Sequence, residues 1–102
     1  MSVKSILQTN KDYCFICKRH RQAIFGGLDL HHIFNSHNKK NSEKYGLLVY
    51  LCHYDCHIFG DKSVHKNNKV NLALKQYAQK KAMSHYGWSI EEFRKVFGKN
   101  YL

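Results

Sequence analysis

Four cysteines fall into two close pairs that have the spacing of metal ligands. Cys14 and Cys17 stand in the segment CFIC, Cys52 and Cys56 stand in LCHYDC, and 34 residues separate the two pairs. Thiolates at such spacing form tetrahedral zinc sites, and a site with four thiolates leaves no open position for a substrate. Four thiols that served only as small buried hydrophobes would not need this pairing. The sequence therefore predicts a structural zinc ion whose loss unfolds the centre of the chain.

Histidines are concentrated between and just after the cysteine pairs. The chain has eight, and six lie between positions 31 and 65, among them the adjacent His31 and His32 in LDLHHIF. Neutral imidazole binds divalent metals and also accepts a proton near neutral pH, so the pair could divide these two tasks. His57 directly follows Cys56, so the zinc would hold its backbone in place. These three histidines are predicted to be functional.

A second metal ion at these histidines needs a third protein ligand, and two candidates follow His57. Asp61 lies four residues further on, which is the same face of a helix if the helix continues. His65 lies eight residues further on, about 12 Å away along an unbroken helix, which is too far to share an ion. If the helix ends at Gly60, the chain could fold back and return His65. The spacing leaves both candidates open.

The segments around these residues predict an α+β fold. Alternating apolar residues predict a strand over 28–34, and an apolar run predicts a second strand over 47–52. The polar segment 35–46 between them is expected to be a loop. A short helix or turn over 53–59 carries the second cysteine pair. The predicted centre is thus strand, loop, strand and short helix.

Two helices are predicted after this centre. Apolar residues at helical spacing cover 69–86, and Gly87 stands where a helix would stop. Ser89 and Glu92 form a capping box at the start of a second helix. The apolar faces of both helices are expected to pack back on the metal-binding centre.

Length and charge restrict the class of protein. The chain of 102 residues fits one domain, expected to span 1–102, and it carries 17 Lys and Arg against 7 Asp and Glu, a net charge of +10. This excess, spread along the chain, favours a nucleic-acid partner. The N-terminal segment has no signal-peptide core and no run is long enough to cross a bilayer, so the sequence predicts a cytoplasmic protein without a membrane partner.

The order of these motifs resembles the HNH endonucleases, also called ββα-metal or His-Me finger nucleases. A cysteine pair, then LDLHHIF, then LLVYLCHYDCH, over about 14–67, is similar to the small phage-encoded type with a four-cysteine zinc. The ending HYGWSIEEFRKVFGKNYL is similar to the ends of small phage proteins of that group. The resemblance implies a zinc-stabilised, treble-clef-like ββα-metal core over about 12–68. Two C-terminal helices over about 69–102 would follow it.

The resemblance also implies roles for individual residues. His31 would bind the catalytic ion, and His32 would be the general base that activates the attacking water. His57 would be the second ligand of the ion. The third would be His65, with Asp61 as the alternative.

The chain departs from the family pattern at its middle asparagine. That residue usually begins the second strand and orients the base histidine, but Gly46 and Leu47 stand there. Asn38 is the candidate to replace it as a catalytic residue, Asn67 is another, and its task could also fall to no residue. Phosphate contacts are expected from four lysines around the centre, namely Lys39, Lys40, Lys62 and Lys66.

The implied function is a metal-dependent DNA endonuclease that nicks or cuts double-stranded DNA. Its cofactors would be structural Zn²⁺ and a catalytic Mg²⁺, Mn²⁺ or another divalent ion, and three imidazole ligands would favour a transition metal. If the chain is encoded by a bacteriophage, it would act in the host-cell cytoplasm, as a homodimer or with a partner phage protein. The alternative is a non-catalytic, zinc-stabilised nucleic-acid-binding module. A protein-interaction domain is a third, which the net charge disfavours.

Overall fold

A computed structural model describes residues 4–61 and 63–102 of the chain. It combines helices with a small two-stranded sheet, which agrees with the predicted α+β class. None of the helices in the described ranges has the length and apolar character needed to cross a membrane. The elements in chain order are η1 (Arg21–Ala23), β1 (Leu28–His32), η2 (Ser36–Asn38), α1 (Lys39–Tyr45), β2 (Leu48–Cys52), η3 (His53–Ile58), α2 (Asn68–Tyr86) and α3 (Ile90–Phe97).

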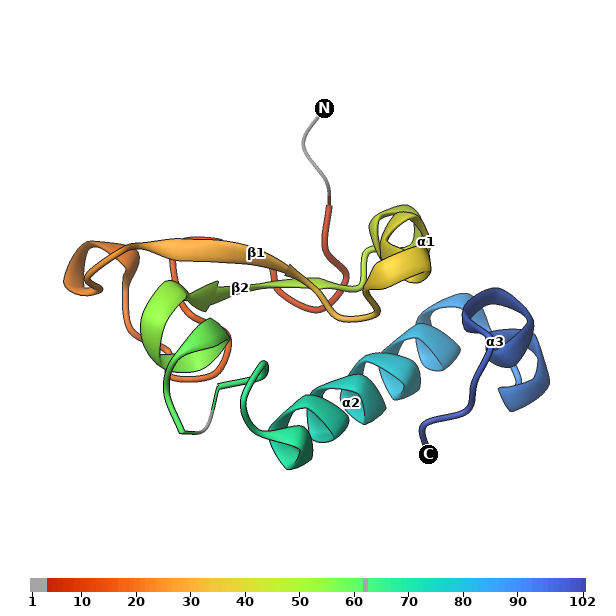
Figure 1. Ribbon diagram of the computed structural model, residues 1–102. Helices are drawn as coiled ribbons and strands as arrows, with labels where there is room; N and C mark the ends of the chain where they lie inside the picture. The colour runs from red at the N-terminus through yellow and green to blue at the C-terminus, as the bar shows by residue number, and fades with distance from the viewer. Residues whose placement is uncertain (1–3, 62) are drawn as a thin grey trace.

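The sheet is an antiparallel pair that lies above the C-terminal helices (Figure 1). Leu28 of β1 pairs with Cys52 of β2, and His32 pairs with Leu48. Both strands were predicted, although β1 ends at His32, two residues earlier than expected. Because side chains alternate along a strand, Asp29 and His31 share one face of β1. The chain leaves β2 directly into η3, which carries the second cysteine pair.

The element η3 is a short π-helix, and it ends in a tight return of the chain. The amides of Phe59 and Gly60 both donate to the carbonyl of Tyr54, at 2.8 and 2.9 Å. A Cβ on Gly60 would lie 2.1 Å from the Asp55 carbonyl oxygen, so only glycine fits this turn. The amide of His65 then donates to the carbonyl of His57 at 3.2 Å. The chain therefore folds back after Gly60. This is the geometry that His65 needs in order to lie beside His57.

The prediction of a loop over 35–46 is wrong in its second half, where Lys39–Tyr45 form α1. Its sequence, KKNSEKY, lacks the apolar spacing that identifies an amphipathic helix. Its only buried residue is Ser42, whose hydroxyl donates to the Phe34 carbonyl and accepts from the Phe34 amide. Gly46, at a φ of 73°, ends the helix in the left-handed conformation. Polar contacts of Ser42 and packing of the Tyr45 ring on Trp88 and Phe97, rather than a continuous apolar face, thus fix α1.

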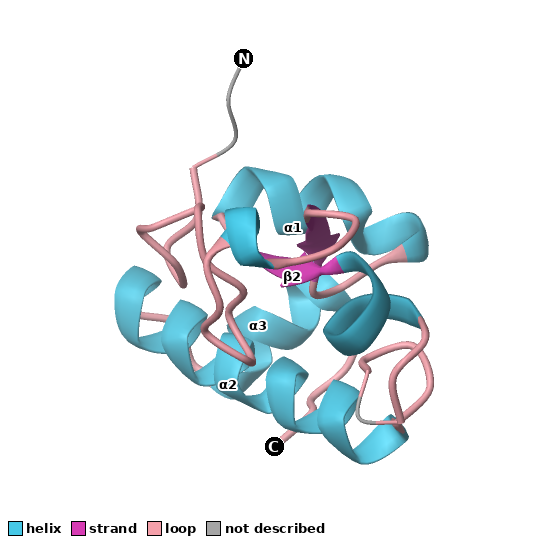
Figure 2. Ribbon diagram, turned by 90° about the vertical axis from the view of Figure 1, so that its left-hand side faces the viewer, coloured by secondary structure: helices cyan, strands magenta, loops and turns pink. Residues whose placement is uncertain are grey.

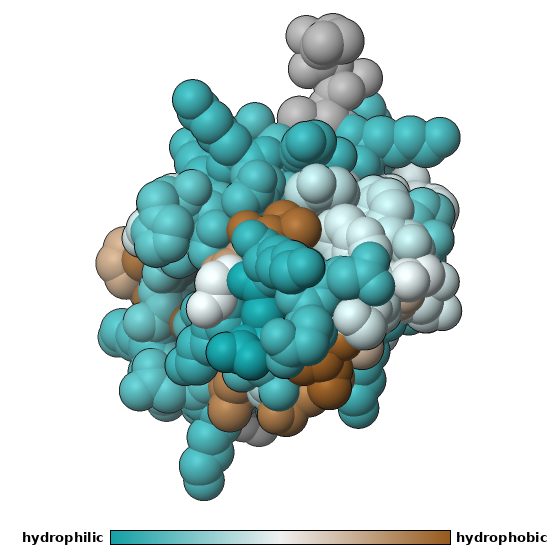
Figure 3. Space-filling model, turned by 90° about the vertical axis from the view of Figure 1, so that its right-hand side faces the viewer, coloured by the Kyte–Doolittle hydropathy of each residue, from teal (hydrophilic) through white to brown (hydrophobic). Residues whose placement is uncertain are grey.

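The two C-terminal helices were predicted correctly and close the core from below the sheet, as both ribbon views show (Figures 1 and 2). Leu74, Ala78 and Ala82 of α2 are buried in the same cluster as the cysteines. The capping box of Ser89 and Glu92 begins α3. The face of the molecule that carries α3 is mostly hydrophilic, with a few apolar patches (Figure 3). Phe93 and Phe97 of α3 are buried in the core.

Aromatic packing joins α3 to the sheet end of the core. The Phe93 ring is fully buried and stands 5.5 Å from the ring of Phe34, centroid to centroid.

We expect Phe93→Ala to lower the free energy of unfolding by about 3 kcal/mol, because it removes a ring and leaves a cavity. The control Leu72→Ala, at a half-exposed site on α2, should cost less than about 0.5 kcal/mol. Urea unfolding measures both, and equal losses would contradict the described core.

Candidate metal centres

The four cysteines meet at one point in the fold. All four are free thiols, and their sulfur atoms lie within 4.8 Å of one another. A tight turn presents the first pair, since the Lys18 amide donates to the Cys14 carbonyl at 2.9 Å and the Cys17 amide donates to the Cys14 sulfur at 3.4 Å. The second pair lies at the end of β2 and in η3. This cluster could hold a metal ion.

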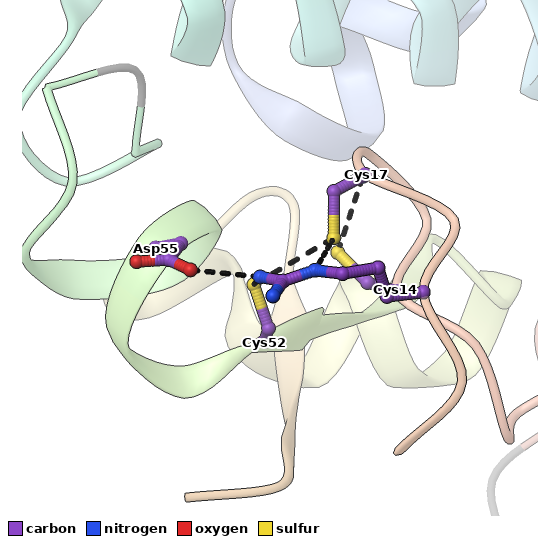
Figure 4. A network of polar contacts seen from close by, with 5 residues as sticks. Cys14, Cys17, Cys52 and Asp55 are labelled. Carbon is purple, nitrogen blue, oxygen red and sulfur yellow. Dashed lines mark hydrogen bonds and ion pairs between the residues drawn. The ribbon is translucent and has the colours of Figure 1, made fainter. Parts of the chain in front are cut away.

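Figure 4 shows Cys14, Cys17 and Cys52 with Asp55 beside them. The guanidinium of Arg19 lies against these sulfur atoms. Its Nε is 3.5 Å from the Cys17 sulfur, and its Nη2 forms an ion pair with Asp55 at 2.7 Å. Burial alone would raise the pKa of the Cys17 thiol, but the hydrogen bond from Arg19 and those of its neighbours lower it to about 6. One thiolate is therefore available at neutral pH without a metal.

The two later cysteines have the opposite tendency. Burial and the neighbouring sulfurs raise the pKa values of Cys52 and Cys56, because further thiolates would repel one another in this space. A divalent cation removes that repulsion and keeps all four groups deprotonated. The donor set, four sulfurs in a closed cluster, suits Zn²⁺ in a structural role.

A metal at this cluster would hold the turn of Cys14 and Cys17, β2 and η3 together, so its removal should unfold them. We expect a strong chelator to abolish the cooperative unfolding transition seen by circular dichroism. Added Zn²⁺ should restore it, whereas Mg²⁺, a poor partner for thiolates, should not. Cys52→Ser should have the same effect as the chelator. Retention of a cooperative transition in the metal-free chain would show that the sulfur cluster is not structural.

A second cluster consists of three imidazoles: His31 from β1, His57 from η3 and His65 from the returning chain. Their ligand nitrogens lie within 4.8 Å of one another, and the Nε2 atoms of His57 and His65 are 3.1 Å apart. They line a cavity of about 200 Å³ together with His32 and Lys39. The structure thus brings together His31, His57 and His65, whereas the carboxylate of Asp61 does not join this cluster within the described ranges.

His31 is the most constrained member of the three-histidine cluster. Its side chain is 4% exposed, and its Nε2 is the buried side-chain nitrogen that lacks a hydrogen-bond partner within residues 4–61 and 63–102. Burial, then the neighbouring His57 and His65, lowers the pKa of His31 to about 3. Burial also lowers the pKa of His65. Both rings are therefore held neutral, the state in which imidazole binds a metal.

Asp29 orients one of these histidines. Its Oδ2 lies 2.8 Å from Nδ1 of His57 and 2.5 Å from Nδ1 of His53. Burial would raise the pKa of Asp29, but the two histidine contacts hold it below its usual value. With Nδ1 bound to the carboxylate, the Nε2 of His57 is directed to His65 and His31, as in many metal sites. Asp29 was not predicted to belong to the site, although its two-residue spacing from His31 places both residues on one face of the strand.

His32 lies at the end of β1 and lines the same cavity, with Nε2 2.8 Å from Oε1 of Glu43 on α1. Glu43 was also missed, because α1 was expected to be a loop.

Asn38 does not orient His32: its side chain donates to the Phe97 carbonyl at 2.9 Å. The Asn67 side chain accepts from the amides of Lys69 and Val70 and caps α2. The role expected for a middle asparagine falls to neither residue in this geometry.

The predicted lysine contacts divide into three cases. Lys39 lines the cavity of the three-histidine cluster. Lys40 and Lys66 are exposed and do not line it. Lys62 lies outside the described residues.

The unpartnered nitrogen of His31 predicts a second metal-binding event that is independent of the cysteines. We expect calorimetric titration of the zinc-loaded chain with Mn²⁺ or Ni²⁺ to give one site, and His31→Ala to remove it while the zinc stays bound. Asp29→Asn should weaken the site by about 10- to 100-fold. His37→Ala, which changes an exposed histidine, is the control and should have no effect. Equal binding by the His31 and His37 variants would refute the site.

Comparison with known proteins adds no family to this geometry. No protein-family model matches the chain, and neither curated proteins nor solved structures give a significant match.

Proposed function

We propose that the chain is a metal-dependent endonuclease of the HNH type, which hydrolyses phosphodiester bonds of DNA. The observation that carries the proposal is the buried Nε2 of His31, without a partner and beside the nitrogens of His57 and His65. Burying an unsatisfied polar atom destabilises a fold, so such an atom in a cavity indicates a ligand. A divalent ion bound by three neutral imidazoles satisfies it.

The order of elements supports a treble-clef-like ββα core. A cysteine knuckle precedes the two strands, and η3 follows with the remaining cysteines and His57. In this arrangement the four-cysteine cluster and the three-histidine cluster share η3, where Cys56 and His57 are neighbours. One structural ion would thereby position a ligand of the second ion.

The residues around the cavity can divide the tasks of hydrolysis. His31, His57 and His65 would hold the divalent ion, which supplies positive charge to the scissile phosphate and the departing 3′ oxygen. Glu43 accepts the Nε2 hydrogen of His32 and so leaves Nδ1 of that ring as the basic nitrogen. That nitrogen takes a proton from the attacking water, and Glu43 stabilises the imidazolium that forms. Lys39 at the cavity rim suits a neighbouring phosphate.

The charge of the chain supports a polyanionic substrate. Seventeen basic residues against seven acidic ones attract DNA without reading its sequence. Binding should therefore weaken steeply as salt rises. A nuclease of this kind needs only the phosphate backbone at its ion, so sequence preference has to come from elsewhere.

Nicking of supercoiled plasmid tests the proposal. We expect the zinc-loaded chain to nick in the presence of Mn²⁺, Ni²⁺ or Mg²⁺, and His32→Ala to lose about 100-fold or more of the rate, as for removal of a general base. Glu43→Gln should lose less, because the ring keeps a hydrogen-bond acceptor. His37→Ala is the matched control and should nick normally. Absence of nicking with every ion, or full activity of His32→Ala, would favour the non-catalytic nucleic-acid-binding module instead.

A further inference from the structure

Three aromatic rings form an exposed ladder beside the histidines. The rings of Phe25 and Tyr54 are stacked at 5.5 Å with an interplanar angle of 28°, and those of Tyr54 and Phe59 at 5.4 Å and 23°. Phe25 is 85% exposed and Phe59 is 53% exposed. Exposed aromatic rings that gather in one place, instead of entering the core, indicate a binding surface.

Two glycines hold the ladder in shape. Gly26 has a φ of 84°, and a Cβ on it would lie 2.6 Å from the Tyr54 ring, so the backbone after Phe25 packs directly on that ring. At the other end, the Phe59 and Gly60 amides both donate to the Tyr54 carbonyl. The backbone beside Tyr54 is thus fixed at both ends of the ladder, which lowers the entropic cost of binding.

His53 connects the ladder to the three-histidine cluster. Its ring meets the Tyr54 ring edge-on at 4.7 Å and the Phe59 ring at 6.1 Å. Its Nδ1 contacts Asp29, the carboxylate that also orients His57. A chain of side-chain contacts, from Tyr54 through His53 and Asp29 to His57, therefore joins the ladder to the three-histidine cluster.

The charges around the ladder suit a nucleotide better than a second copy of the chain. A cavity of about 310 Å³ at Phe25 and Tyr54 is also lined by Arg19 and Asp55. The guanidinium of Arg19 pairs with Asp55 at 2.7 Å, but its side chain is 45% exposed, so it can also donate to a backbone phosphate. Two copies would bring together chains that each carry a net charge of +10. Nucleobases are flat and stack on aromatic rings, and the phosphate backbone that joins them is negatively charged.

We propose that Phe25, Tyr54 and Phe59 form a base-stacking platform that binds an unpaired nucleotide next to the cleavage site. The platform rests on the proposed nuclease function and specifies its substrate as DNA that contains a single-stranded segment, such as a flap, bubble or end. Bases of an intact duplex are stacked on each other, so only an unpaired base can use the rings.

Fluorescence anisotropy with a labelled single strand, and with the duplex of the same sequence, tests the platform. We expect Phe25→Ala in the zinc-loaded chain to weaken single-strand binding by about 5-fold or more and to leave duplex binding unchanged. Phe25 contributes little to the core, so this variant should fold normally. Phe25→Trp should retain single-strand binding, whereas Phe25→Leu, which keeps an apolar side chain but no ring, should lose it. Tyr77→Ala removes a half-exposed ring on α2 and is the control.

Equal effects of Phe25→Ala on both DNA forms, full binding by Phe25→Leu, or a Phe25-dependent dimer in sedimentation would overturn the platform. Plasmid nicking by Phe25→Ala separates the two proposals. If it nicks normally and also binds single strands normally, the platform is wrong and the nuclease stands. If the wild type never nicks but the single-strand preference depends on Phe25, the platform stands as part of a binding module.

Discussion

The fold depends on four sulfur atoms that must occupy one small space. Cys14 and Cys17 come from a turn at the start of the chain, and Cys52 and Cys56 come from the end of β2 and from η3. The pKa of Cys17 is lowered through Arg19, whereas the pKa values of Cys52 and Cys56 are raised, so a cation would be needed for the cluster to assemble as thiolates. This single constraint connects the knuckle, the sheet and η3, the three parts that carry the histidines.

Hydrogen bonds between the sheet and η3 position the three-histidine cluster. Asp29 and His31 project from one face of β1, and the carboxylate of Asp29 reaches His57 on η3. Gly60 permits the sharp return that brings His65 beside His57. The result is a buried, neutral imidazole with no protein partner inside the described ranges. The other polar side chains of the site contact one another, among them Asp29 with His57 and His57 with His65.

Much of this arrangement could be predicted from the sequence because its signals are local. Paired cysteines, alternating strand residues, helical periodicity and the Ser89 capping box each act over a few positions. The helix α1 was not predicted because Ser42 is fixed by the backbone amide and carbonyl of Phe34, a contact that local periodicity does not reveal. For the same reason Glu43 was missed, and the sequence did not reveal that the Asn38 side chain donates to the Phe97 carbonyl. The third ligand depended on the turn at Gly60, which spacing alone left open.

The central claim is that one small domain holds two chemically distinct metal ions, one on sulfur and one on imidazole nitrogen. X-ray absorption at the zinc and manganese edges of the doubly loaded chain tests it most directly. The account predicts four sulfur neighbours at about 2.3 Å around zinc and a shell of nitrogen and oxygen, without sulfur, around manganese. Zinc with a mixed sulfur and nitrogen shell, or manganese with no imidazole neighbours, would contradict it.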